Sequence, residues 1–111
     1  MKKITKFEVD NAPPQARHKF EAFFEFDDGS KKRTPFGARG YDDYTMHKDK
    51  DRRERYWHRH VKDLRTNDPT RAGYLSLFIL WGSETDVHRA ISTYRRRLHE
   101  FNKTGEFQTD L

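Results

Sequence analysis

A short stretch in the middle of the chain holds the residue types from which catalytic and binding sites are built. Residues 40–60 read GYDDYTMHKDKDRRERYWHRH and combine carboxylates, histidines, aromatic rings and many basic side chains. Clustered carboxylates with a histidine could hold the divalent cation of a phosphate-cleaving enzyme. On this interpretation the protein is a small metal-dependent hydrolase or nuclease, with Asp42, Asp43 and His47 at its site.

The same carboxylates have a simpler explanation. Asp49 and Asp51 stand within a run that is otherwise basic from position 48 to position 53. Carboxylates interleaved with cations commonly form surface ion pairs, and aspartate near the start of a helix is favoured by the positive end of the helix dipole. We therefore favour helix capping over a metal site for the acidic residues of this stretch.

Other catalytic patterns are missing from the sequence. His58 and His60 are two positions apart, which on a helix turns their side chains about 200° from each other, so they cannot bind one metal together. The spacings of zinc proteases and deaminases do not occur, there is no cysteine, and no serine stands in a nucleophile-elbow motif. The sequence predicts a protein that is not an enzyme, with no catalytic residue, no metal and no cofactor.

Basic side chains gather on two predicted helices. The chain has 23 Lys and Arg against 18 Asp and Glu, a formal net charge of +5 at pH 7. Arginines on the water side of a helix can contact phosphates and release counterions, although the same residues can form an ordinary solvated face. The predicted contacts with nucleic acid or another anionic partner are Arg52, Arg53, Arg55, Arg59, Arg95, Arg96 and Arg97.

Aromatic residues are frequent for so polar a chain. Nine Phe, five Tyr and two Trp argue against disorder, since disordered chains are poor in these residues. Exposed tyrosines can stack on bases, but docking of helices is favoured, with hydroxyl and ring N–H groups bonded to Asp43, His47 or His60. The expected structural anchors are Tyr41, Tyr44, Tyr56, Trp57 and Trp81.

The first third of the chain predicts an antiparallel sheet. Residues 4–9 mix β-branched and aromatic side chains, and residues 18–27 alternate between apolar and charged ones. Asp27-Asp28-Gly29-Ser30 predicts a hairpin turn, with residues 31–36 as the return strand. The resulting meander of about three strands has an aromatic face that must be covered, by helices or by another chain, and this face includes Phe20, Phe24 and Phe26.

The remainder predicts three to four helices. A first run from about residue 43 to residue 65 has a break near His47. Asp68 is expected to cap a buried helix over residues 70–81, with Pro69 at its first position. Ser83 is expected to cap a last amphipathic helix that Gly105 ends. The predicted fold class is α+β, a small antiparallel β-meander covered by three to four helices.

A chain of 111 residues has room for a single domain. We expect residues 1–36 to form the β-meander, residues 41–103 the helical part and residues 104–111 a tail. No apolar run approaches the roughly 20 residues of a membrane span, and the N-terminus lacks a signal core. These features predict a protein that does not bind membranes and is not secreted.

Four segments within residues 36–102 carry a family resemblance. They are Gly40 to Asp49, Arg52 to His60, the Asn67-Asp68-Pro69 turn, and Tyr74 to Trp81. Together they resemble an uncharacterised family of small basic proteins, a domain of unknown function encoded mainly by large nucleocytoplasmic DNA viruses. The resemblance implies location in the virion or in the cytoplasm or nucleus of an infected host cell, and it implies no activity.

These observations predict a non-enzymatic viral structural or accessory protein. It would bind nucleic acid or an acidic virion protein through its basic helical faces. Two alternatives stay open besides this one. The first is a minor capsid or assembly protein that acts by protein–protein contacts, including contacts with copies of itself, and the second is the metal-dependent hydrolase or nuclease.

Overall fold

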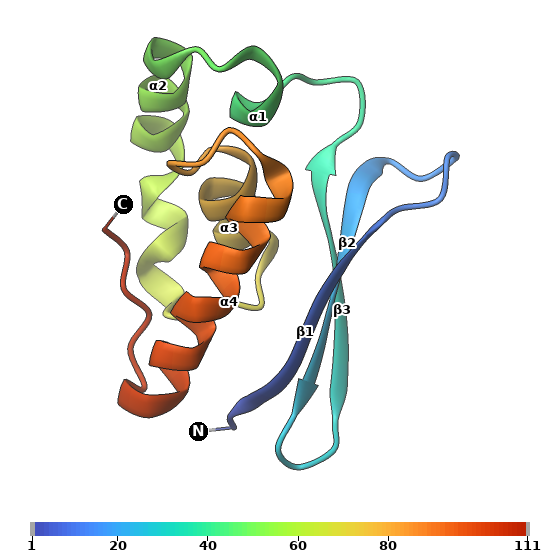
Figure 1. The fold of residues 1–111 in the computed structure, drawn as a ribbon, viewed down its shortest axis with the longest axis vertical. Helices are drawn as coiled ribbons and strands as arrows, with labels where there is room; N and C mark the ends of the chain where they lie inside the picture. The colour runs from blue at the N-terminus through green and yellow to red at the C-terminus, as the bar shows by residue number, and fades with distance from the viewer. Residues whose placement is uncertain (1, 111) are drawn as a thin grey trace.

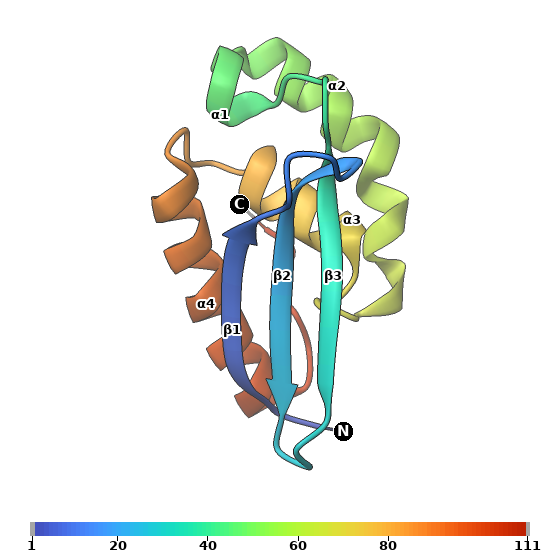
Figure 2. The same ribbon diagram turned by 90° about the vertical axis from the view of Figure 1, so that its right-hand side faces the viewer.

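The sheet forms where the alternating pattern predicts it. The computed structural model describes residues 2–110, so Met1 and Leu111, the ends of the predicted domain, lie outside the described residues. Three antiparallel strands lie side by side in the order β1–β2–β3 (Figure 2). Gly29 allows the turn between the last two strands, because its φ of +84° lies in the left-handed region. The strands are β1 (Ile4–Asn11), β2 (His18–Phe26) and β3 (Lys31–Ala38).

One face of the sheet is apolar and is covered by the helices of the same chain (Figure 1). Phe7 pairs with Phe24 across β1 and β2, and both rings are buried, as is Phe36 on β3. Phe20 and Phe26 pack half-buried against the same core. The α+β class with a three-stranded meander is therefore confirmed. The aromatic face is thus covered by helices of the same chain, which is one of the two kinds of cover that the sequence left open.

Two helices and a 3₁₀ segment follow the sheet. The predicted break near His47 is confirmed, because Lys48 has a φ of +58° and ends the first helix. Asp49 then caps the second helix by accepting hydrogen bonds from the backbone N–H groups of Asp51 and Arg52. The final turns wind more tightly than an α-helix, as is common at helix ends. The elements are α1 (Tyr44–His47), α2 (Lys50–His60) and η1 (Val61–Thr66).

The next two helix starts differ from the prediction. The Asp68 carboxylate accepts from the Thr70 N–H at 3.1 Å, but this stabilises a turn, and the helix begins only after Arg71. Asp86, not Ser83, caps the last helix by accepting the N–H two residues further on. Aspartate makes this local bond in turns as well as in caps, so Asp68 does not by itself fix a helix start. Serine and aspartate both cap helices, so the sequence does not distinguish Ser83 from Asp86. The elements are α3 (Ala72–Leu75), a π-helical η2 (Ser76–Leu80) and α4 (Val87–Thr104).

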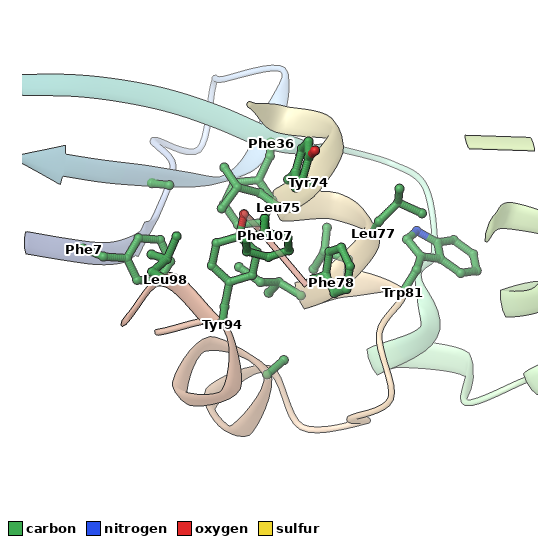
Figure 3. Packing of buried hydrophobic residues seen from close by; sticks show 14 of the residues in the cluster. Phe7, Phe36, Tyr74, Leu75, Leu77, Phe78, Trp81, Tyr94, Leu98 and Phe107 are labelled. Carbon is green, nitrogen blue, oxygen red and sulfur yellow. The ribbon is translucent and has the colours of Figure 1, made fainter. Parts of the chain in front are cut away.

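The α3–η2 segment is the centre of the core. Leu75, Leu77 and Ile79 have no exposed surface, and Figure 3 shows the buried side chains of this segment between the sheet and α4. Trp81 lies at the end of the cluster that faces away from the sheet (Figure 3). Among the described residues, no helix combines the length and apolar character needed to cross a lipid bilayer.

The predicted C-terminal tail is docked on the core. Gly105 ends α4 as expected, with a φ of +79°. The next residues fold back, and Phe107 is only 3% exposed. Its ring lies 5.2 Å from Tyr74, 5.2 Å from Phe78 and 5.5 Å from Tyr94, measured between ring centroids. The segment after α4 therefore completes the hydrophobic core.

The outer edges of the sheet are protected. The Asn102 side chain accepts from the Ile4 N–H at 2.9 Å and donates to the Ile4 carbonyl at 2.8 Å, and Arg95 donates to the Phe7 carbonyl at 2.9 Å. On the opposite edge, β3 contains Pro35, which has no N–H to offer to a further strand. Since an open edge is a template for pairing, these contacts oppose assembly by strand addition.

The β2–β3 turn gives a prediction on pH. The Asp28 carboxylate accepts from the Ser30 hydroxyl at 2.6 Å and from the Ser30 N–H at 2.9 Å, with Lys2 at 3.2 Å. These contacts lower the pKa of Asp28 from 3.8 to about 2. Because the folded pKa lies below the unfolded one, the turn contributes its full stability above about pH 4 and loses it as the pH falls toward 2. An NMR titration of the Asp28 carboxyl carbon should have its midpoint near 2, and Ser30→Ala should move it upward; a midpoint near 3.8 in the unmutated protein would contradict the turn geometry.

Candidate anion-binding cleft

A cleft of about 510 Å³ opens between α2 and the loop that joins β3 to α1. We call it the α2 cleft. Helix α2 forms one wall, the loop of residues 39–43 contributes the other, and the end of η2 closes the floor. The residues that line the cleft include Arg52, Arg55, Tyr56, Arg59 and His60 from α2, Tyr41, Asp42 and Asp43 from the loop, and Trp81 from the floor.

The α2 wall is cationic. Arg52, Arg55 and Arg59 are three and four residues apart, so the helical period places them on one face. All three are exposed, and within residues 2–110 none of them forms an ion pair with a carboxylate. Their positive charge is therefore available to a ligand in the cleft.

The floor of the cleft is formed by packed aromatic rings. Tyr56 stacks on Trp81 with ring centroids 4.2 Å apart and planes at 4°, and His60 packs on the other side of Tyr56 at 4.3 Å. Burial raises the pKa of the Tyr56 hydroxyl above its usual value, so this group stays neutral at physiological pH. The floor therefore offers apolar surface beside the arginines.

Helix α2 is held on the core by one backbone acceptor. The Trp57 ring N–H and the Arg53 guanidinium both donate to the Trp81 carbonyl, the second at 3.3 Å. This carbonyl lies at the end of a helix, where no intrahelical donor is left for it. The expectation that Asp43, His47 or His60 would bond the anchoring rings is thus not met for Trp57.

The loop wall carries a buried ion pair. The Asp43 carboxylate lies 2.5 Å from Lys19 Nζ and is 4% exposed at the side chain. It also caps α1 by accepting from the Thr45 N–H at 2.9 Å. Asp42, by contrast, is exposed and forms no ion pair with any described residue. The loop wall is thus neutral at Asp43 and negative at Asp42.

Tyr41 and Tyr44, both expected to anchor the fold, differ in their exposure to solvent. Tyr44 is buried, with the Arg53 guanidinium 5.3 Å from its ring centroid. Tyr41 is 73% exposed and so does not anchor the fold. Only its backbone is held, because its carbonyl accepts from Lys19 Nζ at 2.9 Å. The short loop turns its side chain toward water at the cleft.

The structure does not bring the proposed metal ligands together. The Asp43 carboxylate is engaged by Lys19, and Nδ1 of His47 accepts from the Asp49 N–H at 2.9 Å. Across the described part of the chain, no three His, Asp or Glu side chains are placed to hold a metal ion. Asp43 and Asp49 serve as helix caps, and Asp43 is also an ion-pair partner, so the geometry gives the hydrolase alternative no support.

The predicted contact arginines outside the α2 cleft mostly stabilise the fold. Arg53 bonds the Trp81 carbonyl, Arg95 bonds β1 and covers the Phe7 ring, and Arg97 donates to two carbonyls of the docked tail. Burial lowers the pKa of Arg97 below its usual value. Arg96 faces water, and its side chain donates only to the Thr93 hydroxyl, at 3.3 Å. Figure 2 shows α4 beside β1 and α2 toward β3, so the two basic helices do not form one surface.

Two residues at the cleft were not singled out in the sequence. Residues 18–27 alternate between apolar and charged side chains, and nothing in this alternation indicates that Lys19 has a partner in the loop. Gly37 has a φ of +77°, and a Cβ there would lie 2.8 Å from Leu80 Cδ1. The predicted return strand ends at residue 36, whereas β3 continues to Ala38, and the sequence does not indicate this close approach of the backbone to the floor.

Part of this chain matches a known protein family. Residues 11–60 match a family of unknown function, DUF5754. The match overlaps the stretch that carries the resemblance at residues 36–60, extends further back to include the β2–β3 hairpin, and does not reach residues 61–102. It also contains every cleft residue discussed above except Leu80 and Trp81. No curated protein and no solved structure matches the chain.

Proposed function

We propose that this protein is a non-enzymatic binding protein that takes nucleic acid against the α2 cleft. The observation that carries the proposal is the set of three arginines on one face of α2, exposed, without carboxylate partners and beside an aromatic floor. Guanidinium groups bind phosphates through paired hydrogen bonds and release counterions on doing so. All three arginines, together with Tyr56 and His60 of the floor, lie within the matched residues 11–60, which further supports a role for the cleft.

This proposal names fewer contact residues than the sequence predicts. Contact is assigned to Arg52, Arg55 and Arg59, whereas Arg53, Arg95 and Arg97 are already bound within the fold. An acidic virion protein, which also offers anionic groups, is the competing partner. The viral context, in the particle or in the infected cell, rests on the resemblance and belongs to the proposal.

A salt titration of binding tests the proposal. Fluorescence anisotropy with a labelled 12-nucleotide strand and with its duplex should show affinity that falls as salt rises. For three phosphate contacts we expect a loss of roughly 20- to 40-fold between 50 and 200 mM salt. The triple variant R52Q/R55Q/R59Q should bind at least tenfold more weakly at 50 mM salt and lose most of its salt dependence.

A charge-matched control separates the cleft from net charge. The variant K6Q/R89Q/K103Q also removes three positive charges, from exposed side chains outside the α2 cleft, and should retain most of the affinity. Equal losses in both triple variants would show that binding follows net charge alone. No binding of either probe at low salt, with binding of a polyglutamate peptide, would assign the cleft to a protein partner.

A further inference from the structure

The two walls of the α2 cleft differ in charge, and this limits the shape of a ligand. The α2 wall presents three unpaired arginines, while the loop wall presents the free carboxylate of Asp42 and an ion pair that is already neutral. A ligand can therefore place anionic groups along the α2 side only. Phosphates brought to the loop side as well would meet the negative charge of Asp42.

The loop wall also presents an aromatic ring that stacks on no other ring among residues 2–110. Tyr41 is 73% exposed and lines the cleft. Its backbone is nevertheless fixed, because its N–H donates to the Ala38 carbonyl at 3.4 Å and its carbonyl accepts from Lys19 Nζ at 2.9 Å. A ring that is exposed on a fixed backbone loses little entropy when it stacks on a ligand.

The size of the cleft suits a small flat group. Its volume of about 510 Å³ falls in the usual range for sites that enclose a single small ligand. An unpaired base with its sugar and phosphate is such a group. A duplex would present phosphates on both sides and keep its ring faces stacked internally, so that Tyr41 would have nothing to stack on.

We infer that the α2 cleft selects single-stranded over double-stranded nucleic acid. An unpaired base stacks on Tyr41, and the neighbouring phosphates bind Arg52, Arg55 and Arg59. This inference rests on the proposed function and adds the form of nucleic acid that the site takes. It assigns the two walls separate roles, the arginines in affinity and salt dependence and Tyr41 in recognition of an exposed base.

Binding measurements with three probes of equal length test this inference. They are a 12-nucleotide single strand, its blunt duplex, and a strand in which the bases are replaced by abasic sites. The single strand should bind at least tenfold more tightly than either of the other two. Tyr41→Ala should weaken binding of the single strand roughly 5- to 150-fold, the usual effect of losing one stacked base, and should leave the duplex and the abasic strand unchanged.

The salt dependence distinguishes stacking from charge. Tyr41→Ala should lower the affinity for the single strand without changing the salt slope, whereas Arg55→Gln should reduce that slope by about 0.7. Tyr41→Phe, which keeps the ring, should bind as the unmutated protein does. Phe23→Ala, which removes a partly exposed ring from the outer face of the sheet, should have no effect.

The outcomes separate this inference from the proposed function. Equal binding of the three probes, with R52Q/R55Q/R59Q still reducing it, would overturn single-strand selection and leave nucleic-acid binding intact. Unchanged affinity of Tyr41→Ala for the single strand would also overturn it. Absence of binding to all three probes at 50 mM salt would remove the proposed function itself.

Discussion

Replacing Phe107 with alanine should destabilise the protein by about 3 to 5 kcal/mol, the usual cost of removing a buried phenyl ring. The ring is 3% exposed and packs edge-on against Tyr74 and Phe78, with interplanar angles of 85° and 73°. Edge-to-face pairs of this kind add to the stability gained from burial alone. Since small domains have only about 5 to 15 kcal/mol in total, this change should lower the melting temperature by 10 °C or more.

Urea unfolding followed by circular dichroism measures this loss as a lower midpoint with an unchanged slope. Gln108→Ala is the matched control, because its side chain is exposed in the same docked segment, and it should stay within about 0.5 kcal/mol of the unmutated protein. If Phe107→Ala stays as close as the control does, the segment after Gly105 does not belong to the core in solution.

The sequence predicted the sheet well because the relevant forces are local. Three of the predicted features depend only on residues that are close together in the sequence. They are the alternation of β2, the Asp28-Gly29 turn, and the apolar face of α4, which includes Ala90 and Tyr94. Phe107 could not be placed in this way. It is one aromatic residue after a helix stop, and its partners lie on α3, η2 and α4, which only the completed fold brings together.

The site was predictable in composition but not in arrangement. The arginines of α2 and α4 look alike in sequence, yet Arg95 and Arg97 bond backbone carbonyls while Arg55 and Arg59 face water. Long guanidinium side chains can cover apolar rings and cap free carbonyls, so charge alone does not show which of them a ligand can reach. Tyr41 shows the converse error, because an aromatic residue was assigned to packing where the loop leaves it exposed.

Among the acidic residues of this stretch, Asp43 should contribute most to the stability of the fold. Asp43→Ala removes the partner of Lys19 and the cap of α1 in one step. Breaking a buried ion pair leaves an uncompensated charge, and losing a cap leaves an unbonded N–H. The Lys19 side chain is 19% exposed and keeps the Tyr41 carbonyl as an acceptor, so part of the penalty is relieved. We expect a loss of about 2 to 4 kcal/mol, measured by urea unfolding.

The neighbouring residue supplies the comparison that decides the role of this carboxylate. Asp42→Ala, at an exposed position without an ion pair in the described chain, should change stability by less than about 0.5 kcal/mol. Asp43→Asn should fall between the two, because asparagine still caps a helix but does not balance the charge of Lys19. If Asp43→Ala were as stable as Asp42→Ala, the Asp43 carboxylate would not contribute to the stability of the fold. Asp43 would then again be a candidate ligand or catalytic residue for the hydrolase hypothesis.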